Sequence, residues 1–196
     1  MAEIKPRYEF RIWSESLTAL RAKLEAKAEA RQTKSQETYL ISAVTEKSNA
    51  KIRTELLDIK VLIDEDRGLE QWRPILKAGF PLSNSAVAEQ IFPSLQLTPP
   101  ALTRVEYTMD EFLEEVMQKE PKIAVVDVAK TRYQFNIGRC AIEYSNITIN
   151  NVRRDTVAVE STDPNAVLQL VRELGINGPN VSYIREIRRI IGWEAA

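Results

Sequence analysis

The chain has 196 residues, 44% of them hydrophobic, which is enough for one substantial core, so a single domain over 1–196 is expected. Its 27 basic and 28 acidic residues give a net charge of −1, which excludes a protein that holds nucleic acid through bulk positive charge. One cysteine, Cys140, and no histidine exclude an intrachain disulfide, a histidine-based catalytic triad and a histidine-liganded zinc site.

The same composition bears on where the protein works. No apolar run approaches the roughly 18–20 residues that a membrane helix needs. A lone cysteine fits a reducing compartment. A cytoplasmic protein that does not associate with membranes is therefore expected.

The expected elements follow one another irregularly along the chain. Residues 7–13 alternate polar and apolar side chains as a strand does, whereas 14–32, rich in Ala, Leu, Lys and Glu, predicts a helix. Prolines and a glycine predict that 69–82 is irregular.

The other expected strands are 37–45, 50–63 (two strands or one bent strand), 102–108, 122–138, 139–151 and 155–161. The other expected helices are 84–92, 108–120 (with a Thr108-x-x-Glu111 capping box), 163–175 and 182–192. About eight strands in neighbouring runs, with helices between them, predict an α+β fold with a largely antiparallel sheet.

Charged side chains share one face of several expected strands. They are Glu9, Arg11, Lys51, Arg53, Lys60, Lys130, Arg132, Glu143 and Glu160. One interpretation is the solvated face of an ordinary antiparallel sheet. The other is a sheet that closes with its apolar face outward under helices, so that the charged face lines an interior.

Without a ligand, the positive side chains that line such an interior would repel one another. Lys and Arg bind phosphate oxygens, and carboxylates hold a divalent ion that bridges them. The sequence has neither a P-loop nor a G-x-G-x-x-G motif, so any metal site must be built from carboxylates, which suit Mg²⁺ or Mn²⁺. The pattern therefore suits a polyphosphate with its metal.

An ordered set of segments resembles the CYTH superfamily, also called triphosphate tunnel metalloenzymes. The segments are "YEFRIW", "KIR…LDIK", "AKTRY", "IEY" and "VAVES…LGI…NVSY". The resemblance implies one CYTH-like domain over 1–196, folded as an antiparallel eight-stranded β-barrel, with helices packed outside and a triphosphate bound in its tunnel.

The resemblance also implies roles for individual residues. The basic residues expected to bind phosphate are Lys51, Arg53, Lys60, Lys130 and Arg132, and the later metal-holding glutamates are Glu143 and Glu160. Tyr183 lies in a stretch similar to the family's C-terminal tyrosine-containing segment.

The first strand departs from the family's E-x-E-x-K pattern. Glu9 keeps the first carboxylate and is expected to hold metal, but Arg11 replaces the second and Trp13 replaces the lysine. Arg11 adds a cation and removes a metal ligand, and its planar fork fits a phosphate oxygen. The usual metal chemistry is therefore in question.

Two functions remain open. In the first, the chain binds a triphosphate or other polyphosphorylated small molecule in a cationic barrel interior, and hydrolyses it with Mg²⁺ or Mn²⁺ as a (tri)phosphatase-like enzyme. The alternative is a catalytically inactive phosphate- or polyanion-binding module, or a protein-interaction module. The expected partner is a small-molecule polyphosphate or phosphorylated metabolite and not a nucleic acid, and a homodimer is left open. Trp72, Trp193 and Cys140 are interpreted as packing residues.

Overall fold

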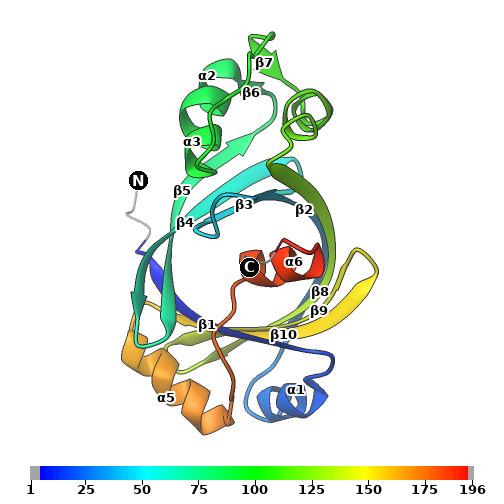
Figure 1. Ribbon diagram of the computed structural model, residues 1–196. Helices are drawn as coiled ribbons and strands as arrows, with labels where there is room; N and C mark the ends of the chain where they lie inside the picture. The colour runs from blue at the N-terminus through cyan, green and yellow to red at the C-terminus, as the bar shows by residue number, and fades with distance from the viewer. Residues whose placement is uncertain (1–4, 194–196) are drawn as a thin grey trace.

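The computed structural model describes residues 5–193, and within them eight strands close into an antiparallel barrel. Around the wall the order is β1-β10-β9-β8-β2-β3-β4-β5, and β5 pairs again with β1. The strands are β1 Arg7–Ser14, β2 Arg31–Ser42, β3 Ser48–Arg53, β4 Leu56–Asp66, β5 Leu69–Gly79, β8 Ile123–Ile137, β9 Cys140–Ile149 and β10 Val152–Ser161. The predicted α+β fold, an antiparallel eight-stranded barrel with helices packed around it, is confirmed (Figure 1).

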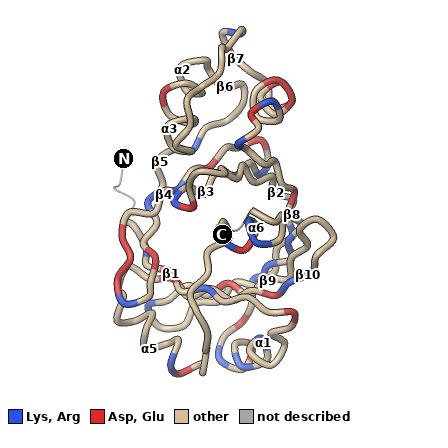
Figure 2. Tube along the Cα trace, in the orientation of Figure 1, with Lys and Arg blue, Asp and Glu red and all other residues tan. Residues whose placement is uncertain are grey.

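The alternation of side chains along each strand separates an outer apolar face from an inner charged one. On β1, Phe10 and Ile12 pack in an outer apolar cluster. Arg11, between them, is 3% exposed, and Lys130 on β8 is 5% exposed. Side chains buried to this degree cannot form a solvated sheet face, so the charged series lies inside the barrel. Lysines, arginines and acidic residues are mixed around the barrel wall (Figure 2).

Two helices cover the outside of the wall at β1, β9 and β10. They are α1 (Thr18–Glu25) and α5 (Pro164–Leu174), and their apolar faces share one cluster with residues such as Ile142 and Val157. The Asp163 side chain caps the start of α5, and Gly175, with φ of 67°, ends it in the left-handed conformation. The predicted helix over 163–175 is confirmed.

The segment between β5 and β8 packs on the outer face of β2, β3 and β4. Its elements are β6 (Leu82–Ser83), α2 (Asn84–Ala86), a π-helical turn (Val87–Ile91), α3 (Phe92–Ser94), β7 (Glu106–Tyr107), α4 (Met109–Glu111) and a second π-helical turn (Phe112–Met117). Phe92 and Phe112 are fully buried against the strands, and the predicted capping box of Thr108 and Glu111 is present. This segment stabilises the wall and lies away from the barrel interior.

The last helix, α6 (Tyr183–Ile190), lies across one end of the barrel interior (Figure 1). Ile184 and Ile187 are fully buried against inward-facing residues such as Ile41, Val128 and Ile149. Arg185 forms ion pairs with Glu65 and Glu70 of the barrel wall and with Glu46 in the connection between β2 and β3. The sequence predicts the helix itself, over 182–192, but not this position. No helix among residues 5–193 is long and apolar enough to cross a bilayer.

Three expected elements differ in the structure. The helix predicted over 14–32 is limited to Thr18–Glu25, because β2 begins at Arg31 to pair with β8 from Gln134 back to Ile123. The segment 69–82, expected to be irregular, is strand β5 up to Gly79, and Pro74 sits beside a register shift that tolerates its missing N–H. The strand over 102–108 shrinks to the two residues of β7.

Burial of Glu70 on β5 makes stability depend on pH. Desolvation raises the pKa of Glu70 to about 7, although Arg185 and the Trp72 indole oppose the shift. From the ordinary value of 4.5 up to about 7, the folded chain holds a proton that the unfolded chain has released. The stability gained from this proton is complete below pH 4.5 and is lost as the pH rises through 7. We expect Glu70→Gln to reduce this slope in urea unfolding between these pH values, whereas the exposed control Glu89→Gln leaves it unchanged. An unchanged slope in Glu70→Gln would show that Glu70 is ionised throughout.

Candidate functional site

A cavity of about 220 Å³ fills the part of the barrel interior that α6 leaves open. Every residue predicted to bind phosphate or metal lines it, namely Glu9, Arg11, Lys51, Arg53, Lys60, Lys130, Arg132, Glu143 and Glu160. They come from β1, β3, β4, β8, β9 and β10, which approach one another only because the barrel closes. The structure thus brings the whole predicted set together, while the role of each residue stays a prediction.

A buried carboxylate that the sequence analysis missed organises the cations of β3 and β8. Glu37 on β2 is 1% exposed, and Lys130 Nζ lies 2.8 Å from its Oε2. Lys51 Nζ lies 3.2 Å from the same oxygen, and Arg53 Nη1 lies 3.5 Å from Oε1. Burial alone would raise the pKa of Glu37, but Lys130 and Lys51 lower it well below its usual range. Glu37 shares a strand face with Tyr39, two residues along, but this spacing alone does not mark it as a site residue.

Lys130 lies at the deep end of the cavity. Its amino group donates to Tyr39 Oη at 2.9 Å and lies 3.9 Å from the centre of the Tyr183 ring. Burial, followed by the nearby charge of Lys51, lowers the pKa of Lys130 to about 7, although Glu37 opposes this shift. Because this pKa lies near neutrality, the charge of Lys130 depends on the other charged groups in the cavity.

Arg11 occupies the middle of the predicted metal site. Its Nε donates to Glu9 Oε1 at 2.7 Å, and its Nη1 lies 3.8 Å from Glu143 Oε1. The guanidinium also donates to Thr156 Oγ1 and lies over the Tyr183 ring, 4.4 Å from its centre. Burial opposes the charge, but Glu9 leads a set of interactions that keep the pKa of Arg11 above its usual value, so the guanidinium stays charged.

The other two predicted metal ligands have different surroundings. Burial opposes the charge of Glu143, but Arg11, Lys130 and Arg132 lower its pKa, and Arg132 Nη1 lies 3.7 Å from Oε2. Burial and the neighbouring Glu9 raise the pKa of Glu160 to about 7. Glu143 is therefore ionised and paired, whereas Glu160 is partly protonated near neutral pH.

These carboxylates do not fit a divalent ion as they are arranged. Glu9 and Glu143 are already paired with the guanidinium of Arg11, and a metal would have to lie beside that fixed positive charge. Within residues 5–193, no group of three or more carboxylate, cysteine or histidine side chains is arranged to hold a metal ion. The geometry therefore gives no support to the predicted Mg²⁺ or Mn²⁺ at Glu9, Glu143 and Glu160.

Further residues complete the cavity wall without having been predicted as site residues. They are Tyr39, Asn49, Asp58, Trp72, Ser182 and Tyr183. Tyr183 stacks on Tyr39 with ring centres 5.6 Å apart, and Trp13 meets it edge-on at 4.8 Å. Trp72, interpreted as a packing residue, donates its indole N–H to Glu70 and also lines the cavity. Residues of α6 lie beside β2 only because of the way the chain folds. The spacing of residues in the sequence therefore did not indicate these contacts.

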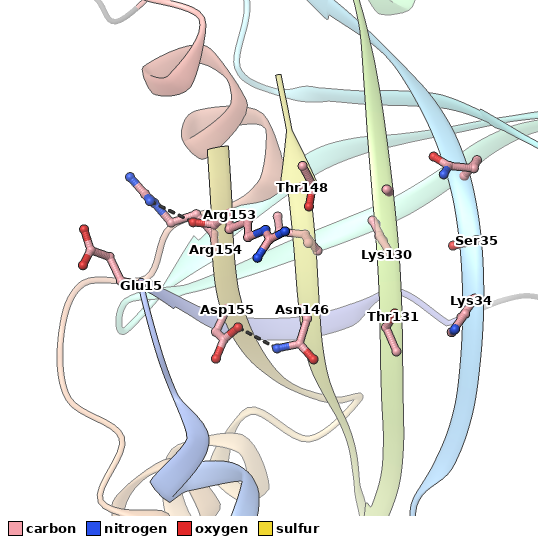
Figure 3. A pocket seen from close by; sticks show the side chains of 13 residues that line it. Glu15, Lys34, Ser35, Lys130, Thr131, Asn146, Thr148, Arg153, Arg154 and Asp155 are labelled. Atoms are coloured by element: carbon pink, nitrogen blue, oxygen red, sulfur yellow. Dashed lines mark hydrogen bonds between the residues drawn. The ribbon is translucent and has the colours of Figure 1, made fainter. Parts of the chain in front are cut away.

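A larger hollow, of about 750 Å³, lies on the outer wall over β2, β8, β9 and β10 (Figure 3). Asp155 there accepts hydrogen bonds from Asn146, from Tyr144 and from the backbone N–H of Leu17. Its carboxylate therefore holds the connection between β1 and α1 in place. The outer hollow gathers fewer charged groups than the interior cavity, so the interior cavity is the candidate site.

Several solved structures have this architecture, and each of them matches nearly the whole chain. The PH1819 protein from Pyrococcus horikoshii is 14% identical with a TM-score of 0.53, covering 93% of this chain and 99% of that one. The PH1012 protein from the same organism is 13% identical with a TM-score of 0.52, covering 91% and 94%. HpAC1 from Hippeastrum, which has a dominant triphosphatase activity, is 13% identical with a TM-score of 0.52, covering 93% and 95%.

These similarities confirm the fold that the ordered segments imply, a closed antiparallel barrel of eight strands. No family model and no curated protein matches the sequence. At 13–14% identity the likeness establishes the fold, and the function has to be argued from the cavity.

Proposed function

We propose that this chain, as one CYTH-like domain, binds a small polyphosphorylated molecule in the barrel interior without needing a divalent metal. The observation that carries the proposal is the convergence of six lysine and arginine side chains from four strands on one cavity. Such groups bind phosphate oxygens through short, charge-assisted hydrogen bonds. A similar fold with triphosphatase activity, HpAC1, supports a triphosphate ligand in general terms.

The charge balance of the cavity limits how strongly it attracts anions. With Glu37 included, the six cations face five carboxylates, the others being Glu9, Asp58, Glu143 and Glu160. This balance explains how the cations coexist without a ligand. A bound polyphosphate would compete with carboxylates for the same N–H groups, so we expect moderate affinity that weakens as salt is added.

Two buried donors are nevertheless poised for a ligand. Among the described residues, neither Arg132 Nε nor the Tyr183 hydroxyl has a hydrogen-bond partner, and both residues line the cavity. Leaving a buried donor unpaired costs about 1–3 kcal/mol, which a phosphate oxygen would recover on binding. The arrangement thus favours an anion with several oxygen acceptors.

Metal-dependent hydrolysis, the enzymatic function predicted from the sequence, is not the activity that this geometry supports best. The guanidinium of Arg11 is already paired with Glu9 and Glu143, two of the three carboxylates that would hold the ion. A guanidinium can hold phosphate oxygens, but it cannot bind and activate a water molecule as a metal does. Binding without turnover is the simpler reading of this site.

The test combines binding and turnover. We expect isothermal titration calorimetry to show one tripolyphosphate bound per chain in EDTA, and phosphate release from tripolyphosphate, thiamine triphosphate and nucleoside triphosphates to stay at background with Mg²⁺ or Mn²⁺. The control Lys34→Gln, on the outer wall, should bind as wild type does. Absence of binding under all conditions would refute the proposal, and metal-dependent turnover would restore the hydrolase prediction.

A further inference from the structure

We infer that the chain carries a site of spontaneous covalent modification at Asn177, where the side-chain nitrogen is lost as ammonia and an isoaspartyl or aspartyl residue remains. The site lies in residues 175–181, here called the strap, which link α5 to α6 (Figure 1). The reaction needs neither a ligand nor a metal, so it is independent of the proposed function.

The sequence places the two reacting groups next to each other. Of the nine asparagines in the chain, Asn177 is the only one that a glycine follows. The side-chain carbonyl carbon of an asparagine and the next backbone nitrogen can close a five-membered ring, and a side chain on the following residue hinders this approach. Gly178 has no side chain, so its nitrogen approaches the Asn177 amide with the least hindrance.

The strap leaves room for this ring at Gly178. The residue has a φ of 122°, in the region that favours glycine. A Cβ atom added there would meet only Ile12 Cγ2, at 3.9 Å, so the neighbouring atoms do not enclose the backbone. The Gly178 N–H has no hydrogen-bond partner among residues 5–193. Its nitrogen can therefore lose the proton and turn without breaking a bond of the fold.

The backbone of the strap is fastened on both sides of the site but not at it. On one side, Ile176 donates its N–H to the Val171 carbonyl, and on the other, Val181 donates to the Arg11 carbonyl. Within the described part of the chain, the backbone of residues 177–179 makes no hydrogen bond. The rotation that brings the two groups together can therefore occur between these anchors, while α5 and β1 stay in place.

The Asn177 side chain is exposed and is held by one local contact. Its Nδ2 donates to the Gly175 carbonyl at 3.1 Å, within the strap itself. An exposed group loses such a bond at little cost, because water replaces the partner. Asn177 and Gly178 also border a hollow of about 360 Å³ beside Trp13, through which water and hydroxide reach the amide.

The reaction consumes only water. The deprotonated Gly178 nitrogen attacks Cγ of Asn177, the new C–N bond closes a succinimide ring, and the side-chain nitrogen leaves with a third proton as ammonia. Water then opens the ring at one of its two carbonyls. Opening at the former backbone carbonyl gives isoaspartate, which adds one carbon to the backbone, and opening at the side-chain carbonyl gives aspartate. The rate rises with pH, because the attacking nitrogen must lose its proton.

The other asparagines are protected by their position or by their neighbour. Five of them lie in strands or helices, whose paired backbone cannot turn to close the ring. Asn180 lies in the strap, but three hydrogen bonds to β1 and to the turn between β4 and β5 hold its side chain. Asn151 is exposed in the turn between β9 and β10, but Val152 follows it with a branched side chain. Asn177 should therefore react first.

Ageing of the folded protein, followed by peptide mass spectrometry, tests the inference. We would keep the whole chain at neutral and at mildly alkaline pH, beside a sample unfolded in urea. The peptide that contains Asn177 should gain the mass of an amide-to-acid change, faster at the higher pH. It should react at least about tenfold faster than the peptide of Asn151, where the branched side chain hinders the attack. Isoaspartate can be counted with an isoaspartyl methyltransferase and a labelled methyl donor.

A variant and its matched control locate the reaction. Asn177→Gln should remove the isoaspartate signal from the folded protein, because glutamine would need a six-membered ring, whereas Asn151→Gln should leave the signal unchanged. Conversion in urea but not in the folded protein would overturn the inference, because the strap would then hold the groups apart. Absence of conversion in both samples, or an isoaspartate signal that persists in Asn177→Gln, would overturn it as well.

Discussion

Replacing Glu37 with glutamine is expected to lower the free energy of unfolding by about 3–5 kcal/mol, because it leaves buried cations without their counter-charge. Glu37 has no exposed side-chain surface and lies within 4 Å of Lys51, Arg53 and Lys130. Glutamine keeps the shape and one acceptor oxygen but removes the negative charge. The remaining positive groups would repel one another in a region from which water is largely excluded.

The measurement is urea unfolding of Glu37→Gln beside Glu114→Gln, which makes the same chemical change at an exposed position of the outer helical segment. We expect the control to unfold as wild type does. Tripolyphosphate should restore part of the stability of Glu37→Gln, and should raise its midpoint more than that of wild type, because the anion would supply the missing charge. Wild-type stability in Glu37→Gln would contradict the assignment of Glu37 as the counter-charge of these cations.

Replacing Arg132 with glutamine is expected to weaken tripolyphosphate binding about 10- to 100-fold, the range for a lost hydrogen bond between charged groups. Arg132 is paired only loosely with Glu143, at 3.7 Å, and its Nε is buried without a partner among the described residues. It therefore has more capacity for a ligand than Lys51 or Lys130, whose amino groups already contact Glu37.

The matched control for this variant is Arg153→Gln, which removes the same charge from an exposed position on β10 that lines the outer hollow. Titration calorimetry at fixed ionic strength should show wild-type affinity for the control. Equal affinity losses in Arg132→Gln and Arg153→Gln would mean that the anion responds to overall charge and not to the cavity.

The alternation of charges along the strands was enough to predict which charged side chains share a face, because a strand side chain has only two faces to choose between. It left open whether that face was solvated or interior. Lys51 and Arg53 mark the charged face of one strand, and Lys130 and Arg132 mark the charged face of another. The ordered segments then indicated the barrel, which turned separate strand faces into one lining. Nine residues from six strands could be assigned to one place in this way.

What the sequence could not reveal depends on contacts between distant segments. The helix-forming residues after Glu25 are overridden by the pairing of β2 with β8, and Pro74 hides β5 because a strand proline is usually a breaker. Glu37 was missed because its ion-pair partner Lys130 lies 93 positions later in the sequence, so the pairing follows only from the fold. The position of α6 across one end of the barrel interior follows from packing alone, so this position could not be predicted from the sequence.

A crystal structure of the protein soaked with tripolyphosphate and Mn²⁺ tests the central claim most directly. We predict phosphate density inside the barrel, with oxygens in contact with Arg132 and the Tyr183 hydroxyl, and no manganese anomalous peak at Glu9, Glu143 or Glu160. A manganese peak held by these carboxylates, with Arg11 displaced from them, would contradict metal-independent binding. Phosphate density confined to the outer wall would contradict the interior site altogether.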